Sequence, residues 1–368
     1  MLFYIKILKK LNKILIIIQR SNGDVFLSSS LIKNLYNYYQ FPQIDVLVND
    51  DTKEIAELLP NINFIHTFSY SQKKSNRFKQ EKSIISAIYK KYDLSISLTA
   101  SDRSVIYAFL AGKKSISAIE VDHKKSWWKK ILLSSYYFFD KNKHILLNNL
   151  QPLNILKIDH SNIHEPLTCN SKIIHSIKNK LDKRGIKNFL VFHPSAQYNY
   201  KIYPRHLRDQ LLARLNTLGL PILITGTKNI LDLSIEKELP SFSNVHNFIG
   251  ETSLEECFAL SNLALAYIGM DTLNMHIAAS QNKRIFAIFG PTNLKMWSPW
   301  SNELETSAKT DNAVQNYGGV TIFQASFPCV ACGNAGCDNL KGRSECLYVI
   351  DPNKVFNEVK NWYANVKL

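Results

Sequence analysis

Apolar and polar residues alternate along most of the chain in the pattern of a parallel α/β protein, in which a short buried strand precedes each amphipathic helix. The clearest stretch is YIGMDTLNMHIAASQNKRIFAIFGPTNLKMWSPW, residues 267–300, which predicts a strand, a helix, a second strand and a loop. The first strand ends in Asp-Thr and the second in Gly-Pro-Thr. Parallel strands end at one edge of their sheet, where ligands usually bind, so we expect chemistry at these two tips.

The N-terminal part of the chain follows the same plan. An apolar run at Ile14–Gln19, a turn at Gly23-Asp24, a helical pattern to about Tyr39 and the apolar run IDVLVND predict a βαβ unit. The segment YDLSISLTASDRSVIYAFLAG repeats a strand, a polar tip and a helix that ends near Gly112. This half of the chain therefore predicts one α/β domain, residues 1–165.

A second α/β pattern begins after a polar stretch, residues 161–188, which predicts one helix and no strand and is the candidate linker. FLVFHPSA, PRHLRDQLLARLNTLG and LPILITGT predict a strand, a helix and a strand, and SLEECFALSNLA predicts a helix with a capping box formed by Ser253 and Glu256. We expect a second domain over residues 186–350 and a last helix over 351–368. Two such domains imply a cleft between them, where ligands usually bind.

The composition agrees with two soluble domains: the 368 residues are 45% hydrophobic and 20% charged. The longest apolar runs fall short of the roughly 20 residues that span a bilayer. The N-terminal segment MLFYIKILKKLNKILIII has interspersed lysines and no cleavage site of small residues, which argues against a secretion signal. We expect a cytoplasmic protein.

The net charge of +15 indicates an anionic partner: nucleic acid, a membrane surface or a phosphorylated substrate. The alternative is a lysine-rich genome bias in which the charges only solvate the surface. No nucleic-acid-binding fingerprint is present, so nucleic acid is not an expected partner.

Four of the six cysteines lie within CVACGNAGCDNLKGRSEC, with the spacing C-x2-C-x4-C-x8-C, namely Cys329, Cys332, Cys337 and Cys346. This spacing is typical of a tetrahedral site with four thiolate ligands, and a cytoplasmic chain argues against disulfides. We expect structural zinc, with iron as the second choice. Cys169 and Cys257 are expected to be unligated.

Five motifs occur in the order of a known family: RSNGDV, SDRS, HPSAQYNYKIYP, GMDTLNMHIAA and FGPTNLKMWSPW, which begin at residues 20, 101, 193, 269 and 289. The chain resembles the bacterial lipopolysaccharide heptosyltransferases of glycosyltransferase family 9, and within them the branch that adds a side-chain heptose to the inner core. The resemblance implies a GT-B fold of two Rossmann-like domains, with the acceptor mainly on the first and the nucleotide-sugar on the second. It also implies an inverting reaction, ADP-heptose as the donor and no metal in catalysis.

Inverting glycosyl transfer needs a base that takes the proton of the attacking hydroxyl. Asp24 matches the family's proposed base. The alternative is that Asp24 only caps a helix that begins near Phe26.

The leaving nucleoside diphosphate needs a cation and backbone amides in place of a metal. The resemblance assigns the diphosphate to Lys201, with amides near Ser195, where relatives usually have glycine. It assigns sugar hydroxyls to Asp271, and Thr272 is expected to cap the following helix. His276, one turn further on, is expected to reach the diphosphate, and Thr292 is expected to face the donor.

Each of these donor assignments has an ordinary structural alternative. Lys201 can be a solvated lysine, Asp271 and Thr272 can be turn and cap residues, and His276 can be a buried histidine bonded to a backbone carbonyl. Leu273 stands where many relatives have a small residue.

On the acceptor side the strand tip TASDRS offers Arg103, and DHKKSWWKK, residues 122–130, offers four lysines around Trp127 and Trp128. Cations and interfacial tryptophans suit a phosphorylated, membrane-attached lipopolysaccharide acceptor and a peripheral contact with the inner membrane. The alternative is a core-packing aromatic pair among solvated lysines. We therefore expect an enzyme that moves heptose from ADP-heptose to an inner-core sugar. The rival functions are a protein O-heptosyltransferase and a non-catalytic, basic, metal-binding GT-B protein.

Overall fold

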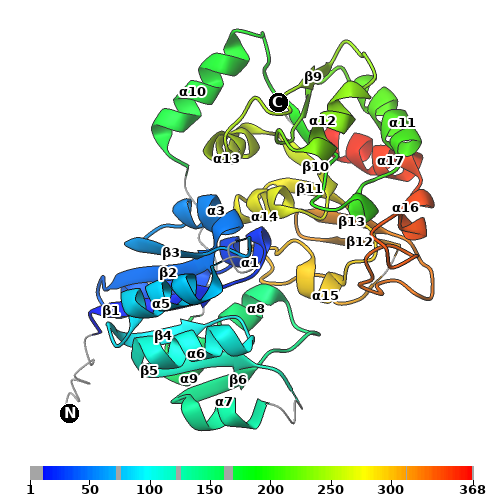
Figure 1. Ribbon diagram of the computed structural model, residues 1–368. Coiled ribbons are helices and arrows are strands. Elements are labelled where there is room, and N and C mark those ends of the chain that lie inside the picture. Colours follow the sequence, from blue (N-terminus) through cyan, green and yellow to red (C-terminus); the bar gives the residue numbers. More distant parts are fainter. Residues whose placement is uncertain (1–10, 72–75, 122–125, 161–168, 312, 367–368) are drawn as a thin grey trace, which may run out of the picture. The chain divides into compact units, whose positions relative to one another are not determined.

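The computed structural model describes residues 11–71, 76–121, 126–160, 169–311 and 313–366 (Figure 1). The chain divides into two compact units, Met1–Ile163 and His164–Leu368. Each unit is an α/β layer with its own sheet.

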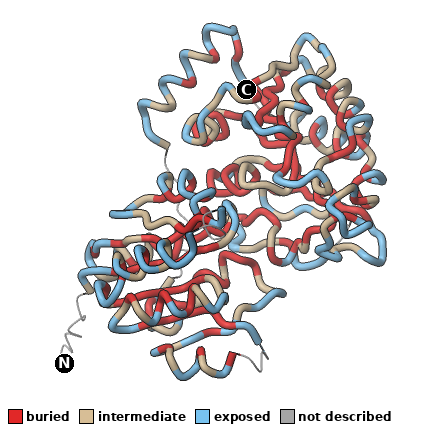
Figure 2. Tube along the Cα trace, viewed as in Figure 1, coloured by how far each residue is buried: buried red, intermediate tan, exposed pale blue. Residues whose placement is uncertain are grey.

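The first unit contains a sheet of six parallel strands in the order β3-β2-β1-β4-β5-β6. The strands are β1 (Lys13–Ile18), β2 (Gln43–Asn49), β3 (Phe64–Phe68), β4 (Tyr92–Ser97), β5 (Gly112–Ile119) and β6 (Ser135–Phe138). Five successive residues of β1, from Ile14 to Ile18, are fully buried, as a central strand covered on both faces requires (Figure 2).

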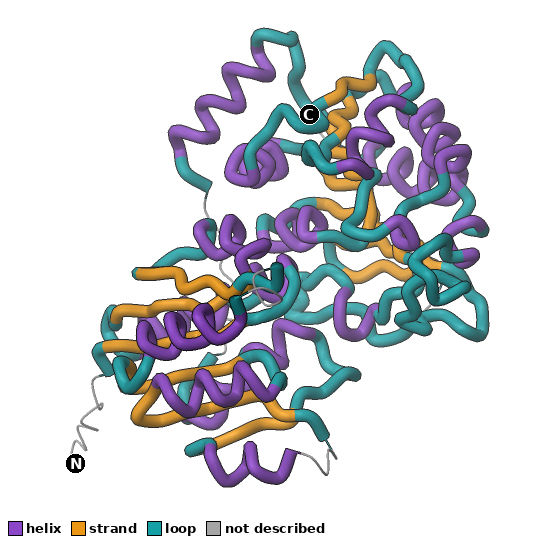
Figure 3. The backbone as a smooth tube through the Cα atoms, viewed as in Figure 1, coloured by secondary structure: helices purple, strands orange, loops and turns teal. Residues whose placement is uncertain are grey.

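Helices cover this sheet on its two faces: α1 (Asn22–Phe26), α2 (Ser29–Tyr38), η1 (Asp50–Thr52), α3 (Lys53–Glu57), α5 (Arg77–Ile88), α6 (Asp102–Ala111), α7 (Trp127–Leu132), α8 (Ile145–Asn149) and α9 (Gln151–Leu156) (Figure 3). On one face, Ile84 and Ile88 of α5 and Tyr107 of α6 pack against Leu15 and Ile17 of β1. Among the described residues of the whole chain, no helix is long and apolar enough to cross a membrane.

The single helix expected up to Tyr39 is divided in two. Ser21 is the N-cap of α1, so Gly23 and Asp24 lie inside a helix and not in a turn before one. The hydroxyl of Ser28 donates to the carbonyl of Val25 at 2.7 Å, and α2 begins after this residue. Serine side chains compete for helix carbonyls in this way, which explains the break.

The second unit contains a seven-stranded sheet in the order β12-β13-β11-β10-β7-β8-β9, in which only β12 is antiparallel to its neighbour. The strands are β7 (Leu190–His193), β8 (Ile222–Ile224), β9 (Val245–Asn247), β10 (Ala266–Met270), β11 (Arg284–Phe289), β12 (Val314–Tyr317) and β13 (Val320–Gln324). The β12–β13 hairpin was not predicted, although its YGGV turn is a hairpin signal.

The helices of the second unit are α10 (Ser171–Asp182), η3 (Asn199–Lys201), α11 (Arg205–Asn216), α12 (Ile230–Lys237), α13 (Leu254–Leu263), α14 (Leu273–Ser280), α15 (Leu294–Trp297), α16 (Glu345–Tyr348) and α17 (Pro352–Tyr363). Residues of α11 and α17 form the core on one face of the sheet, and residues of α10, α13 and α14 form it on the other.

Several local predictions for this unit are confirmed. The candidate linker contains one helix, α10, within its described part, and residues 161–168 lie outside the described residues. The capping box forms as the spacing predicted, since Ser253 N–H donates to Glu256 Oε2 at 3.0 Å and Glu256 N–H to Ser253 Oγ at 3.2 Å. The loop expected after β11 contains one short helix, α15, with Asn293 as its N-cap.

Candidate functional site

The predicted donor residues gather where β7, β10 and β11 end. These three strands are parallel neighbours, so their tips lie at one edge of the sheet (Figure 1). Ser195 follows β7, Asp271 and Thr272 follow β10, and Thr292 follows β11. The strand-tip geometry expected from the sequence is therefore present in this unit.

Lys201 and Asp271 form an ion pair at this edge, with Nζ 2.9 Å from Oδ2. Burial opposes the charge on Lys201, but the Asp271 carboxylate outweighs it and raises the pKa of Lys201 above its usual value. Both side chains are largely shielded, with 25% and 9% of their surface exposed. Lys201 is thus a charged, partly buried lysine at the strand tips and not a solvated surface lysine.

His276 lies in α14, one turn beyond Asp271, and is buried. Burial lowers the pKa of its imidazole to about 4, with the Asp271 carboxylate raising it and Lys201 lowering it further. Its Nδ1 has no hydrogen-bond partner among the described residues. The backbone carbonyl expected as the structural alternative is therefore not found at Nδ1, and the ring is neutral at physiological pH.

Ser195 is held by a residue that sequence reasoning missed. Its hydroxyl donates to Asp232, the third residue of α12, which is 2% exposed. Asp232 also accepts from the backbone N–H and from the hydroxyl of Thr227, the latter at 2.9 Å. One buried carboxylate thus ties the loop after β7 to the loop after β8.

His193 forms a second buried polar group at the same edge. Its Nδ1 lies 3.1 Å from Thr225 Oγ1 and 3.1 Å from Asn274 Nδ2, and burial lowers its pKa to about 4. β10 passes very close here, because a Cβ on Gly269 would lie 2.4 Å from the carbonyl oxygen of His193. His193 and Asn274 both belong to family-like motifs, which was the available signal for them.

Thr272 and Thr292 both lie at the strand tips, but the side chain of Thr272 does not have the role expected of it. Thr272 is the N-cap residue of α14, but its side chain makes no capping hydrogen bond; its Oγ1 lies 3.4 Å from the Tyr267 hydroxyl. The capping role expected of this side chain is therefore wrong. Thr292 is buried, and its carbonyl accepts from Gln324 Nε2 at 3.1 Å.

In the first unit, Asp24 is 3% exposed and lies just beyond the tip of β1. Its Oδ2 accepts from the backbone N–H of Ser21 at 3.2 Å and from the Ser21 hydroxyl at 2.6 Å. Its Oδ1 lies 2.7 Å from Arg20 Nε but has no hydrogen-bond partner among the described residues. Burial raises the pKa of Asp24, although Arg20 and Ser21 lower it. The N-cap alternative is wrong, since Ser21 occupies that position.

The acceptor-side candidates are partly engaged within the unit. Arg103 stacks on the ring of Phe68, 3.7 Å from its centroid, and donates from Nη2 to the Tyr70 hydroxyl at 2.8 Å. Trp128 packs against a small core cluster, whereas Trp127 is 64% exposed. The expected aromatic pair therefore divides into one core residue and one surface residue.

The four lysines expected around the tryptophans are not equivalent. Lys129 is buried and pairs with Asp102, with Nζ 2.8 Å from Oδ1, so it is not a solvated lysine. Lys130 is exposed and lies over the rings of Tyr136 and Phe138. Residues 122–125 lie outside the described residues.

In the cysteine segment, Cys346 is buried and Cys329, Cys332 and Cys337 are exposed. Burial, and then the charges of the other three thiols, raise the pKa of Cys346 to about 11. Among the described residues, no group of three or more His, Cys, Asp or Glu side chains is arranged to hold a metal ion. The described residues therefore do not form the tetrahedral set expected from the spacing.

Two α/β units built on parallel sheets define the GT-B class of glycosyltransferase fold, and solved heptosyltransferases share this architecture. The chain itself belongs to glycosyltransferase family 9, the heptosyltransferase family. The family model matches residues 83–322, which is more than half of the 368-residue chain.

Similar proteins agree with this assignment. Lipopolysaccharide heptosyltransferase 3 of Escherichia coli K12 is 25% identical over 77% of this chain and 84% of its own length. ADP-heptose lipopolysaccharide heptosyltransferase II of E. coli superposes with a TM-score of 0.68 and 19% identity, over 95% of this chain and 98% of that one. The iron-containing dodecameric glycosyltransferase TibC of enterotoxigenic E. coli matches with a TM-score of 0.51 and 12% identity, over 97% of this chain and 78% of that one.

Proposed function

We propose that this protein is an inverting glycosyltransferase that moves heptose from ADP-heptose to a sugar of the lipopolysaccharide inner core. The observation that carries the proposal is the Lys201–Asp271 ion pair beside the neutral His276 at the strand tips. Family membership and the names of the similar proteins support heptose as the sugar and lipopolysaccharide as the acceptor.

On the donor side, the diphosphate takes Asp271's place as the partner of Lys201, and the positive charge stabilises the leaving group as its bond breaks. Asp271, once released, accepts hydrogen bonds from sugar hydroxyls. The N-terminal amides of α14 and the amides near Ser195 face the phosphates, and Nδ1 of His276 and the Thr292 side chain supply further polar contacts. Lys201 thus provides the cation, and catalysis needs no metal.

On the acceptor side, Asp24 is the base. The acceptor hydroxyl gives its proton to Oδ1 of Asp24, its oxygen bonds to the anomeric carbon, and the bond from that carbon to the diphosphate oxygen breaks with inversion. Burial makes the carboxylate a stronger proton acceptor than an ordinary aspartate, and Arg20 orients it. Arg103 is the candidate contact for acceptor phosphates.

The test is to incubate the purified protein with ADP-heptose and a lipopolysaccharide core that lacks its last heptose. We expect release of ADP and a product with inverted anomeric configuration, measured by NMR. Transfer to a protein in place of the core would support the O-heptosyltransferase, and ADP-heptose binding without release of ADP in the presence of either acceptor would support a non-catalytic protein.

We also propose that the first unit contacts an anionic membrane surface through α7 and β6. Trp127, Ile131, Tyr136 and Phe138 are exposed there. Lys130 Nζ lies 5.8 and 5.3 Å from the ring centroids of Tyr136 and Phe138, which brings α7 and the exposed rings of β6 together. Exposed aromatic side chains beside a lysine suit the interface of an anionic bilayer, as does the net charge of +15.

Trp127→Ala is expected to weaken binding to vesicles that contain anionic phospholipid, measured by co-sedimentation. Phe78→Ala removes an aromatic residue of the same unit, in α5, that is still more exposed than Trp127, and serves as the control. Equal binding by both variants, or binding to neutral vesicles only, contradicts the proposal.

Finally, we propose a structural zinc or iron ion at Cys329, Cys332, Cys337 and Cys346. The C-x2-C-x4-C-x8-C spacing supports it, as do the turns at Gly333 and Gly336, whose φ angles are +71° and +88°. TibC is an iron-containing glycosyltransferase, and zinc suits the same four donors equally.

Elemental analysis of the purified protein should give about one metal ion per chain, and chelation should lower the melting temperature. Protein without metal whose four thiols react freely in the native state contradicts the site.

A further inference from the structure

The four-cysteine segment, residues 329–346, contacts the turn Gly290-Pro291-Thr292 at the donor edge. Gly333, the residue directly after Cys332, donates its N–H to the carbonyl of Pro291 at 2.8 Å. A thiol of the segment is thus one residue away from a hydrogen bond that holds the turn.

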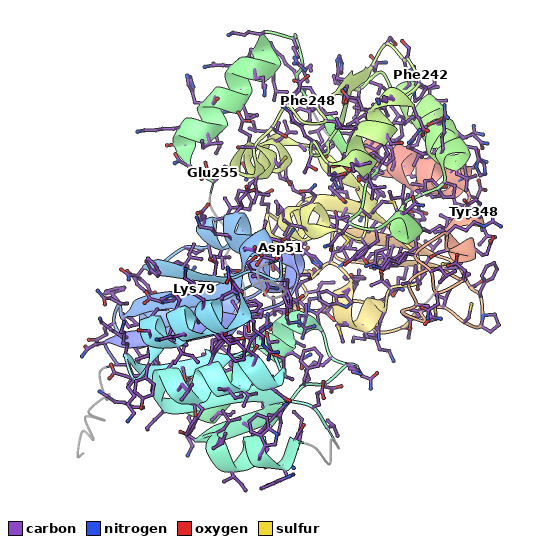
Figure 4. The ribbon with its side chains drawn as sticks, viewed as in Figure 1. Asp51, Lys79, Phe242, Phe248, Glu255 and Tyr348 are labelled. Carbon is purple, nitrogen blue, oxygen red and sulfur yellow. The ribbon has the colours of Figure 1, made fainter. Side chains whose placement is uncertain are left out.

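The other end of the segment contacts the same turn. Leu347, directly after Cys346, is 1% exposed and packs on Gly290 so closely that a Cβ there would lie 3.2 Å from Leu347 Cγ. Tyr348, which Figure 4 labels, follows it in α16 and has the Arg343 guanidinium 5.1 Å from its ring centroid. Two residues that each follow a cysteine therefore hold one strand tip.

The rest of the turn is fixed from the sheet. Nε2 of Gln324, the last residue of β13, donates to the carbonyls of Gly290 and Thr292, both at 3.1 Å. All three carbonyls of the turn are therefore bonded: two by the end of a strand, and the central one by the cysteine segment. Only the central bond comes from a residue, Gly333, that lies outside any helix or strand.

A further contact reaches the loop that carries Lys201. Lys341 Nζ lies 5.7 Å from the ring centroid of Tyr198, and Tyr198 stacks on Tyr200 with a centroid separation of 5.4 Å. Tyr200 directly precedes Lys201, the partner of Asp271. The segment thus contacts both loops that flank the proposed diphosphate site.

We infer that the four-cysteine segment is a positioning element of the donor site, so that the order of this segment, which a metal ion shared by its four thiols would fix, sets the affinity for the nucleoside diphosphate. This inference rests on the proposed function, which places the donor at these strand tips. A metal ion held by Cys332 and Cys346 would fix Gly333 and Leu347 relative to each other, and with them the turn. Without the metal ion, the segment loses conformational entropy each time the turn adopts the binding geometry, and this loss weakens ADP binding.

The test measures ADP binding by calorimetry in the full-length protein as purified, in chelator-treated protein, and in four single variants, Cys329→Ser, Cys332→Ser, Cys337→Ser and Cys346→Ser. Loss of one positioning hydrogen bond should raise the Kd for ADP about threefold to tenfold. Cys169→Ser and Cys257→Ser, which change cysteines outside the segment, should leave the Kd unchanged.

Lys341→Ala tests the same role if a cysteine variant does not fold. Lys341 is exposed, so its side chain can be removed without disturbing the hydrophobic core. We expect a higher Kd for ADP at an unchanged melting temperature, and a higher donor KM at an unchanged acceptor KM. Leu340→Ser, its exposed neighbour, should change neither.

Lys201→Ala separates the two hypotheses. If it weakens ADP binding while chelation, the cysteine variants and Lys341→Ala do not, the positioning role is wrong and the donor site stands. If ADP binding is insensitive to Lys201→Ala as well, the proposed donor site is wrong.

Discussion

The two strand-tip regions that carry the candidate residues are built in opposite ways. In the first unit, the contacts of Asp24 come from Arg20 and Ser21, at most four positions away in the chain. In the second unit, Lys201 meets Asp271 across 70 positions, and His193 meets Asn274 across 81. A base needs one carboxylate with a tuned pKa, which a single helical turn supplies, whereas a diphosphate and a sugar must be surrounded by several loops.

The largest effect should come from breaking the local site. Asp24→Asn keeps the shape of α1 but removes the proton acceptor, so turnover should fall about 100-fold or more with ADP binding nearly unchanged. Steady-state kinetics and calorimetry measure the two quantities. Asp50→Asn, a change at an exposed carboxylate in η1, is the control, and wild-type turnover in Asp24→Asn would leave Asp24 with only its capping-box role.

Breaking the long-range site should act on binding. Lys201→Ala removes the charged partner of the diphosphate and leaves Asp271 as a shielded, unpaired carboxylate, so the Kd for ADP should rise about tenfold or more. Lys201→Arg should recover part of the affinity. Lys178→Ala, which changes an exposed lysine of α10, controls for net charge. If both variants weaken ADP binding equally, Lys201 acts only through the net charge and does not contact the diphosphate.

The local site around Asp24 could be predicted from the sequence better than the long-range site around Lys201 and Asp271. The spacing of Ser21 and Asp24 is a capping-box signature that would have moved the helix start to Asn22, so the first site was readable and the prediction of a turn there was avoidable. Lys201 and Asp271 were both predicted, but their ion pair was not. Asp232 carried no signal at all, because its contact with Ser195 joins residues 37 positions apart.

The cysteine segment shows the limit of spacing arguments. Its thiols were found from the sequence, but the described residues do not form the tetrahedral set that the spacing predicts. Its contacts with Pro291 and Gly290 could not be predicted, because they depend on which loop the folded segment faces. Periodicity likewise predicted the central strands of both sheets, and missed β3, β5, β6 and β9 as well as the β12–β13 hairpin.

The pH dependence should sharpen the local site. Asp24 must be ionised to act, and its folded pKa is raised, so kcat/KM should fall on acidification at a pH above the range of an ordinary aspartate. Ser21→Ala removes the hydroxyl hydrogen bond that lowers this pKa and keeps the bond from the backbone N–H, so the acid limb should move to still higher pH with a smaller loss of rate than in Asp24→Asn. An acid limb that does not move would assign it to another group.

The smallest effect should come from the buried carboxylate that joins two donor-side loops. Asp232→Asn places amide hydrogens where Asp232 now accepts from Ser195 and Thr227, so at least one buried donor loses its acceptor, at a cost of about 1–3 kcal/mol. For a unit of this size the melting temperature should fall by about 2–8 °C, with the donor KM raised only a few-fold. Ser195→Gly alone removes one of the competing donors and should cost less. In the double variant the amide introduced at position 232 no longer faces the Ser195 hydroxyl, so the two costs should not add. Thermal unfolding of the four proteins measures this coupling, and strict additivity would mean that Ser195 and Asp232 stabilise their loops independently.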